Sequence, residues 1–401
     1  MAVGVHEIRP FRVSVTADAM TDLHDRLSRT RWPDQLSGSG WSQGADVSYV
    51  RALCDYWLHE FDWRAAENEL NGWPQYRTVI DGQTVHFLHV RSPHAEAMPL
   101  LLTHGWPGSI WEFADLLGPL TDPVAHGGRR ADAFHVVCPS IPGYGWSGPT
   151  TEPGWDIQRV ARMEGELMQL LGYERFGAQG GDWGSMATAN LAVHIPDRLV
   201  GIHLNLVMVQ PPDVVDDDLG RAELARRAEL DREERGYSAI QRTKPQTLAF
   251  GLTDSPAGLA AWMLEKYRSW TDCGGDLESV LTRDMVLRNI ATYWFTATVA
   301  SSARLYYESH RSGRSPLPDQ YVSVPTACAL FPKELWRPPR AWAERAYNVV
   351  RWTEHPKGGH FAAMEQPAAL AEDLREFFGP LWRRAARDPD KVSVNPQMTD
   401  C

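Results

Sequence analysis

The chain has 401 residues, of which 43% are hydrophobic and 23% are charged, and its formal net charge at pH 7 is −11. A chain of this length and composition folds as a globular protein with one large domain and an insertion, or with two domains. The negative charge argues against nucleic acid or an anionic membrane as the main partner.

The sequence carries no sign of secretion or of a membrane anchor. The N-terminus lacks a basic segment followed by an apolar core, and no apolar stretch is long enough to span a membrane. The five cysteines are widely spaced and include no CxxC pair, so their spacing predicts neither a disulfide framework nor a zinc site. We therefore expect a soluble, cytoplasmic protein with reduced thiols, no membrane span and no bound metal.

Residues 1–75 are predicted to form a helical extension that precedes the main sheet. Thr16 is placed to cap one helix, and a second helix is predicted from about Val47 to Phe61. Each predicted helix has one apolar face that must be covered. We expect the extension to pack on the main domain.

Strand and helix patterns alternate from residue 75 onward. Strands are predicted at 75–80, 84–90, 99–103, 133–138, 175–178 and 199–206, with helices at 111–117, 157–171 and 186–195. The first two strands flank Asp81-Gly82, a hairpin turn signal. The alternation predicts an α/β fold with a mostly parallel sheet and helices on both faces.

The alternation stops at Pro211-Pro212 and resumes only near residue 321. The segment between is charged and helical in pattern, which predicts a helical cap, and strands at 321–331 and 348–353 with a helix at 367–378 complete the chain. The predicted division is an extension (1–75), a first core part (76–210), a cap (211–318), a second core part (319–385) and a polar tail (386–401).

The stretch Gly180-Gly181-Asp182-Trp183-Gly184 follows a predicted strand and precedes a predicted helix. This is the layout of the nucleophile elbow, in which small residues flank an apex residue held in a tight turn. The apex is normally serine, whereas here it is Asp182. A carboxylate can attack an sp³ carbon that bears a leaving group, such as an epoxide or alkyl halide carbon. The plainer interpretation is an aspartate that caps the following helix.

The loop His104-Gly105-Trp106-Pro107-Gly108-Ser109 directly follows the predicted buried strand at 99–103. In α/β-hydrolases this loop provides one oxyanion donor, and the residue after the nucleophile provides the other. The predicted donors are the backbone amides of Trp106 and Trp183.

His360 and Glu334 occupy the places expected for a base and its acidic partner. His360 lies on a glycine-rich loop after the last predicted strand, and Glu334 directly follows the strand at 321–331. The order nucleophile, acid, histidine is that of α/β-hydrolases. A neutral imidazole there can deprotonate the water that hydrolyses an enzyme ester.

An epoxide oxygen leaves as an alkoxide unless a proton donor assists, and a tyrosine hydroxyl in the cap suits that role. The candidates from residue type alone are Tyr237, Tyr306, Tyr307 and, less favourably, Tyr267 and Tyr293. Their positions in the sequence do not show which of these tyrosines is the proton donor.

Taken together, these motifs resemble the α/β-hydrolase epoxide hydrolases, in particular the microsomal-type branch with an N-terminal extension. The resemblance runs from Phe11 to about Trp382, and its motifs are Arg31-Trp32-Pro33, Gly72-Trp73-Pro74, His104–Ser109, Gly180–Ser185, Tyr293–Thr296 with Ser301-Ser302, Phe331–Glu334 and Gly358–Phe361.

The resemblance implies an epoxide hydrolase that works without a cofactor. It implies Asp182 as the nucleophile, His360 as the base, Glu334 as its partner, and Tyr237 and Tyr306 as the groups that activate the epoxide. The doublet Tyr306-Tyr307 leaves the register of the second tyrosine open by one residue.

Trp106, Pro107, Trp183 and Tyr307 are expected to line a pocket for an apolar or aromatic epoxide, and a homodimer is expected from family analogy. The rival interpretations are a haloalkane dehalogenase with the same nucleophile and a catalytically silent small-molecule receptor.

Overall fold

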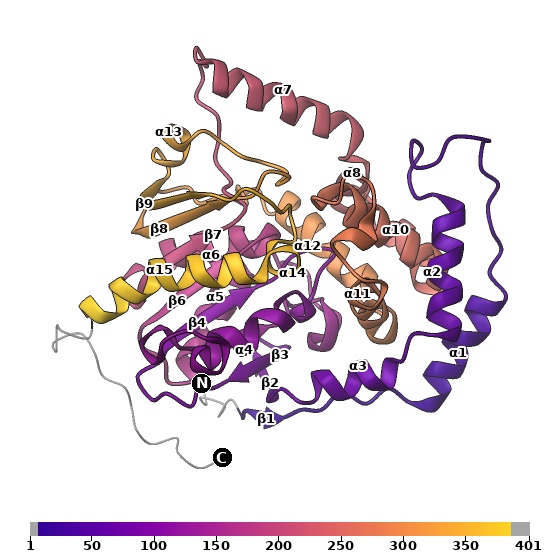
Figure 1. The fold of residues 1–401 in the computed structure, drawn as a ribbon, viewed down its shortest axis with the longest axis horizontal. Coiled ribbons are helices and arrows are strands. Elements are labelled where there is room, and N and C mark those ends of the chain that lie inside the picture. Colours follow the sequence, from indigo (N-terminus) through magenta and orange to yellow (C-terminus); the bar gives the residue numbers. More distant parts are fainter. Residues whose placement is uncertain (1–6, 386–401) are drawn as a thin grey trace.

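The computed structural model describes residues 7–385, which form a central sheet covered by helices on both faces (Figure 1). The polar tail predicted at 386–401 lies outside the described residues. The sheet has nine strands in the order β1-β2-β3-β5-β4-β6-β7-β8-β9. Its strands are β1 (Arg9–Pro10), β2 (Gln75–Ile80), β3 (Gln83–Val90), β4 (Met98–Thr103), β5 (Phe134–Pro139), β6 (Phe176–Gly180), β7 (Leu199–Leu204), β8 (Val322–Leu330) and β9 (Tyr347–Glu354).

The sheet is antiparallel from β1 to β5 and parallel from β5 to β9. Every residue of β4 and of β6 is buried, which is the pattern of central parallel strands covered on both faces. The β2–β3 turn has positive φ at both Asp81 and Gly82, as a tight hairpin requires. The predicted α/β-hydrolase fold with its mostly parallel sheet is therefore confirmed.

Helices flank the sheet and fill the interval between β7 and β8. The core helices are α4 (Ala114–Thr121), α5 (Ile157–Leu170), α6 (Asp182–His194), α13 (Arg340–Ala343), α14 (Ala362–Glu365) and α15 (Pro367–Ala385). The cap helices are α7 (Asp218–Glu233), α8 (Gly236–Thr243), α9 (Pro245–Asp254), α10 (Pro256–Trp270), α11 (Arg283–Thr296) and α12 (Val299–Arg311). None of the helices within residues 7–385 is long and apolar enough to cross a membrane.

The N-terminal extension contains α1 (Ala17–Ser28), α2 (Val47–His59) and α3 (Trp63–Leu70). Helix α3, which Asp62 caps, is short and was not predicted from the sequence. In Figure 1, α1 and α2 lie against the cap helix α10, and β1 joins the edge of the sheet. The extension therefore contacts both the sheet and the cap.

Candidate active site

The turn between β6 and α6 places Asp182 at the carboxyl end of the sheet. Asp182 adopts φ 48°, a left-handed conformation that is rare for a residue with a side chain. The backbones around it approach closely, since a Cβ added at Gly184 would lie 1.9 Å from the carbonyl oxygen of Thr103. Helix α6 begins at the apex itself, four residues before the predicted helix at 186–195. The glycines around the apex are therefore a steric requirement of the elbow.

Two separate loops contact the Asp182 carboxylate. The backbone amide of Trp106, in the loop after β4, donates a hydrogen bond of 2.8 Å to Oδ1. Nε2 of His360, in the loop between β9 and α14, lies 3.3 Å from Oδ2. The two contacts fix the orientation of the carboxylate from opposite loops.

His360 is joined on its other ring nitrogen to Glu334. Nδ1 lies 2.6 Å from Glu334 Oε1, which also accepts a hydrogen bond of 2.6 Å from the amide of Leu335. Both His360 and Glu334 are buried. Burial lowers the pKa of His360, but the charge of Glu334 and the contact with Asp182 outweigh it and raise this pKa well above its usual value. The two carboxylates on either side therefore favour the protonated imidazole.

The cap brings Tyr237 and Tyr306 together above Asp182. Tyr237 lies in the first turn of α8 and stacks on Trp106, with ring centroids 4.9 Å apart and planes at 8°. Tyr306, on α12, packs edge-on against Trp183 at 4.8 Å and against Tyr237 at 5.9 Å. Burial and the charge of Asp182 raise the pKa of the Tyr237 hydroxyl, and burial and the neighbouring Tyr237 raise that of Tyr306. Both hydroxyls therefore remain proton donors at neutral pH.

The Tyr306 hydroxyl is buried and has no hydrogen-bond partner among residues 7–385. A buried polar group without a partner is uncommon and marks a position where a ligand atom can bind. Its neighbour Tyr307 faces elsewhere, with the guanidinium of Arg311 5.5 Å from its ring centroid. Consecutive residues on a helix point in different directions, so only one tyrosine of the doublet can face the site.

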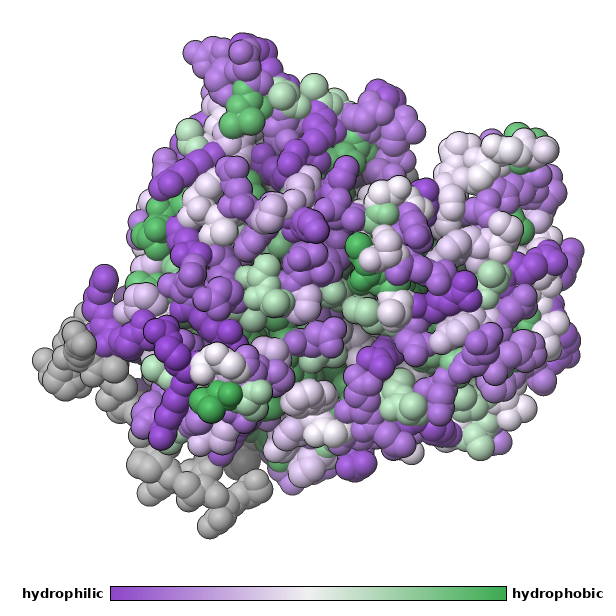
Figure 2. Space-filling view, viewed as in Figure 1, coloured by the Kyte–Doolittle hydropathy of each residue, from purple (hydrophilic) through white to green (hydrophobic). Residues whose placement is uncertain are grey.

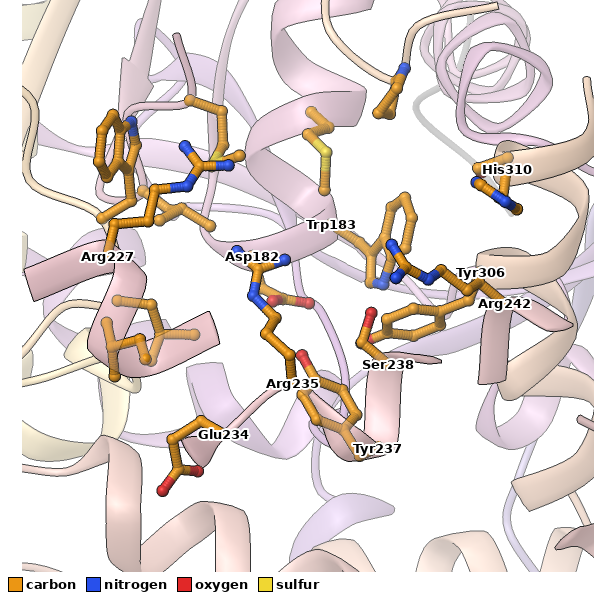
Figure 3. Close-up of a pocket in the computed structure, with 18 of the residues that line it drawn as sticks. Asp182, Trp183, Arg227, Glu234, Arg235, Tyr237, Ser238, Arg242, Tyr306 and His310 are labelled. Carbon is orange, nitrogen blue, oxygen red and sulfur yellow. The ribbon is translucent and has the colours of Figure 1, made fainter. Parts of the chain in front are cut away.

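A cavity of about 290 Å³ opens beside Asp182 (Figure 3). Trp183 lines it, as expected, together with Tyr237, Trp270 and Tyr306. The predicted lining residues Pro107 and Tyr307 are not among the residues that line this cavity, and Trp106 lines a smaller space behind the nucleophile.

The carbonyl of Pro107 instead accepts a hydrogen bond of 2.9 Å from the Tyr267 hydroxyl. Tyr293, the other weaker candidate from the cap, donates a hydrogen bond of 2.8 Å to the carbonyl of Gly108. Both hydroxyls hold the loop after β4 in place, which accounts for these two tyrosines without a role in proton donation.

Two residues of the site were missed from the sequence. Trp270 ends α10, its carbonyl accepts a hydrogen bond of 2.9 Å from the amide of His360, and its ring lies 5.0 Å from the imidazole. Glu112 lines the small space behind Asp182, and burial raises its pKa to about 8. Neither residue belongs to a recognisable sequence motif. Only the tertiary fold brings them close to Asp182, so the sequence alone did not point to them.

The fold and site define an α/β-hydrolase with an aspartate at the elbow. Residues 8–113 match the family described as epoxide hydrolase N terminus, and residues 98–232 match the alpha/beta hydrolase fold family. A putative epoxide hydrolase of Stigmatella aurantiaca is 48% identical over 378 residues, covering 93% of this chain and 85% of that protein. Epoxide hydrolase 1 of Sus scrofa is 38% identical, covering 93% and 89%.

Solved structures agree with these relatives. The juvenile hormone epoxide hydrolase of the silkworm Bombyx mori superposes with a TM-score of 0.87 at 30% identity, covering 94% of this chain and 96% of that one. The Aspergillus niger epoxide hydrolase superposes with a TM-score of 0.83 at 31% identity, covering 94% and 97%. The chain therefore belongs to the epoxide hydrolase family, as its motifs predicted, and its enzyme class is epoxide hydrolase.

Proposed function

We propose that this enzyme converts an epoxide to a vicinal diol through a covalent ester on Asp182. The observation that carries the proposal is the arrangement of one carboxylate beneath two tyrosine hydroxyls, with a His360–Glu334 pair on its other side. Asp182 and the two tyrosines line the cavity, His360 and Trp106 line the smaller space beside Asp182, and Glu334 contacts His360.

In the first half-reaction, Tyr237 and Tyr306 donate hydrogen bonds to the epoxide oxygen. One oxygen of Asp182 attacks a ring carbon, a new carbon–oxygen bond forms, and the bond from that carbon to the epoxide oxygen breaks. The alkoxide that forms is stabilised by the two hydroxyls, because their hydrogen bonds strengthen as charge develops on the oxygen.

Formation of the ester changes the protonation of His360. The ester removes the negative charge of Asp182, one of the two carboxylates that raise the pKa of the imidazole. The imidazolium then loses its proton, and this proton ends on the alkoxide, so the ring opening leaves a neutral alcohol and a neutral imidazole. The same residue is thereby converted from a resting acid to a base.

In the second half-reaction, neutral His360 removes a proton from water, which attacks the ester carbonyl carbon. The amides of Trp106 and Trp183 are the proposed donors to the oxyanion. Collapse of the intermediate breaks the carbonyl carbon–alkoxy bond, and the leaving alkoxide takes the proton that His360 removed from water, which completes the diol. The second proton of the water, now on the Asp182 carboxyl group, passes to His360, so Asp182 returns as a carboxylate beside an imidazolium. Glu334 supports the positive charge on the imidazole throughout.

Two rival interpretations differ from this proposal at identifiable groups. A haloalkane dehalogenase has no use for paired hydroxyls above the nucleophile, whereas the unpartnered Tyr306 hydroxyl suits an epoxide oxygen. A silent receptor has no use for a buried histidine paired with a buried acid. The cytoplasmic location and the homodimer expected from the sequence stay predictions.

The test is to incubate the variant His360→Gln with a panel of epoxides and to measure its intact mass. The variant can form the ester but cannot activate water, so the protein should gain the mass of one epoxide, with the adduct on Asp182 after proteolysis. An adduct on another residue, or none with any epoxide that the wild type turns over, would count against the covalent mechanism.

A further inference from the structure

The cavity beside Asp182 has an unexpected concentration of positive charge. Four arginines line it, which we call the arginine rim: Arg227, Arg235, Arg242 and Arg314. Figure 3 shows Arg227, Arg235 and Arg242 arranged around the space next to Asp182. A chain with a net charge of −11 therefore has a substrate cavity of the opposite sign along part of its wall. The sequence predicted an aromatic and apolar pocket, whereas the structure adds these arginines.

Most of the rim has no carboxylate of its own. Arg235 pairs with Asp231 at 2.8 Å, and Arg227 reaches the same carboxylate only at 3.9 Å. Within residues 7–385, neither Arg242 nor Arg314 lies within 4.0 Å of a carboxylate.

Besides Asp182, the acidic residue that lines the cavity is Glu234, and its carboxylate already has a cationic partner. Its Oε2 lies 3.0 Å from Nζ of Lys266. The positive charge of the arginine rim is therefore left uncompensated by the lining.

Arg227 has a weak counter-ion, because Asp231 lies 3.9 Å away and also pairs with Arg235. Its side chain is half-buried, and its guanidinium lies over the ring of Trp336, 4.5 Å from the centroid. Burial and the neighbouring Arg235 lower the pKa of Arg227, and the carboxylates of Asp231 and Glu223 offset this only in part. An anion bound beside it would relieve both effects.

Part of the remaining lining of the cavity is apolar. Met186, Leu206 and Met208 line the same cavity beside Asp182. The volume of about 290 Å³ lies at the small end of ligand pockets, which span roughly 300–1,000 Å³. A compact substrate can therefore reach Asp182 with one end and the arginine rim with the other.

We infer that the substrate is an epoxide that carries an anionic group, such as a carboxylate, on a short apolar spacer. This inference rests on the proposed function and specifies its substrate class. The epoxide ring binds between Asp182 and the two cap tyrosines, and the anion binds at the arginine rim through guanidinium hydrogen bonds, which match planar oxyanions. The rim thereby offsets the repulsion between the substrate anion and Asp182.

The test compares ω-epoxyalkanoates of increasing chain length with their methyl esters, using kcat/KM at low and high salt. At the favoured length the acid should exceed its ester by about tenfold or more, because a charge-assisted hydrogen bond is gained. The advantage should shrink at high salt. An ω-epoxyalkyl phosphate shows which anion the rim prefers. If its kcat/KM exceeds that of the carboxylate, the preferred group is a dianion, and if it is lower, the preferred group is a carboxylate. Either result supports binding of an anion at the rim.

The variant Arg242→Gln tests the rim itself, since Arg242 is exposed and makes no ion pair in the described chain that its loss would break. It should lower the acid-to-ester ratio of kcat/KM several-fold, mainly through KM. Arg311→Gln is the matched control, because Arg311 lies on α12 but does not line the cavity. That control should leave the ratio unchanged.

An acid-to-ester ratio near one at every chain length and at low salt overturns the inference. The inference is also overturned if neither Arg242→Gln nor Arg227→Gln changes the acid-to-ester ratio of kcat/KM. Turnover of the neutral esters with no preference for acids would overturn this inference alone. Failure to hydrolyse any epoxide, neutral or anionic, would instead overturn the proposed function.

Discussion

The backbone amide of Trp106 donates a hydrogen bond of 2.8 Å to Oδ1 of Asp182 in the resting enzyme. The same N–H is the proposed donor to the oxyanion during ester hydrolysis. The nucleophile and the oxyanion site therefore share one fixed dipole, which is in place before substrate arrives. The ring of Trp106 also stacks on Tyr237, so one residue connects the nucleophile to the cap.

Replacement of either cap tyrosine by phenylalanine should slow ring opening while leaving the fold intact. Each hydroxyl stabilises the developing alkoxide, so Tyr237→Phe and Tyr306→Phe should each lower the alkylation rate by about 10²–10⁴-fold, and the double variant should be inactive. Because both pKa values are raised, the wild-type alkylation rate should show no loss from tyrosine ionisation up to about pH 10. Stopped-flow tryptophan fluorescence with styrene oxide measures these rates.

The doublet provides an internal control for that experiment. Tyr307→Phe removes a hydroxyl from the next residue of α12, whose ring faces Arg311. It should leave the alkylation rate unchanged. An effect of Tyr307→Phe as large as that of Tyr306→Phe would contradict the assignment of the second tyrosine.

Glu334→Gln should separate the two half-reactions. The neutral amide no longer supports the imidazolium, so ester hydrolysis should slow by about 10²–10⁴-fold and the alkyl-enzyme should accumulate. Glu334→Asp keeps the charge and should retain part of the hydrolysis rate. Single-turnover kinetics with quench and intact mass measure both steps. Hydrolysis at the wild-type rate in Glu334→Gln would mean that another group orients His360.

The elbow glycines should be intolerant of a side chain, unlike glycines in open helices. A Cβ at Gly184 would lie 1.9 Å from the backbone oxygen of Thr103, so Gly184→Ala should destabilise the protein by about 2 kcal/mol or more. A Cβ at Gly251 of α9 meets nothing within 4 Å, and Gly251→Ala should stabilise by about 0.5–1 kcal/mol. Urea unfolding gives both free energies. Equal effects at the two positions would contradict the steric account.

Glu164 on α5 should make the free energy of unfolding depend on pH. It is fully buried, accepts one hydrogen bond of 2.8 Å from Thr103, and its Oε2 has no partner among residues 7–385. Burial raises its pKa to about 8, above the value near 4.5 of an unfolded chain. The stabilising contribution of protonated Glu164 to the free energy of unfolding is therefore fully present below about pH 4.5 and is lost as the pH rises through about 8.

Glu164→Gln imitates the protonated acid and should remove this dependence. The variant should match the wild type near pH 5 and exceed its free energy of unfolding by a few kcal/mol near pH 9. Urea unfolding at the two pH values makes the comparison. A variant less stable than the wild type near pH 9 would show that the carboxylate is charged and stabilised in the folded protein.

The elbow and the sheet were predictable because their signals are local. The glycines around Asp182 are a steric need of one turn, and the buried run at 99–103 is a pattern of one strand. The loops that carry Trp106 and His360 could be placed because parallel strands end at one edge of the sheet. These patterns therefore singled out Asp182, His360 and Glu334, which the structure brings together.

The cap side of the site could not be derived in the same way. Spacing left several tyrosines as candidates, and the resemblance narrowed them to Tyr237 and the Tyr306-Tyr307 doublet. Only the orientation of α12 in the structure separated Tyr306 from Tyr307. The arginine rim comes from α7, from α8 and from the chain after α12, which meet only in the folded cap. The raised pKa of Glu164 likewise depends on burial, which a sequence pattern does not report.

The most direct test of the covalent mechanism is a single turnover in water enriched in the heavy oxygen isotope, with enzyme in excess over epoxide. If Asp182 is the nucleophile, the first diol contains only ordinary oxygen, because its new oxygen comes from the carboxylate. The heavy isotope then appears in the proteolytic peptide that contains Asp182. Heavy oxygen in the diol of the first turnover, with an unlabelled Asp182 peptide, would show that water attacks the epoxide directly and would contradict the ester mechanism.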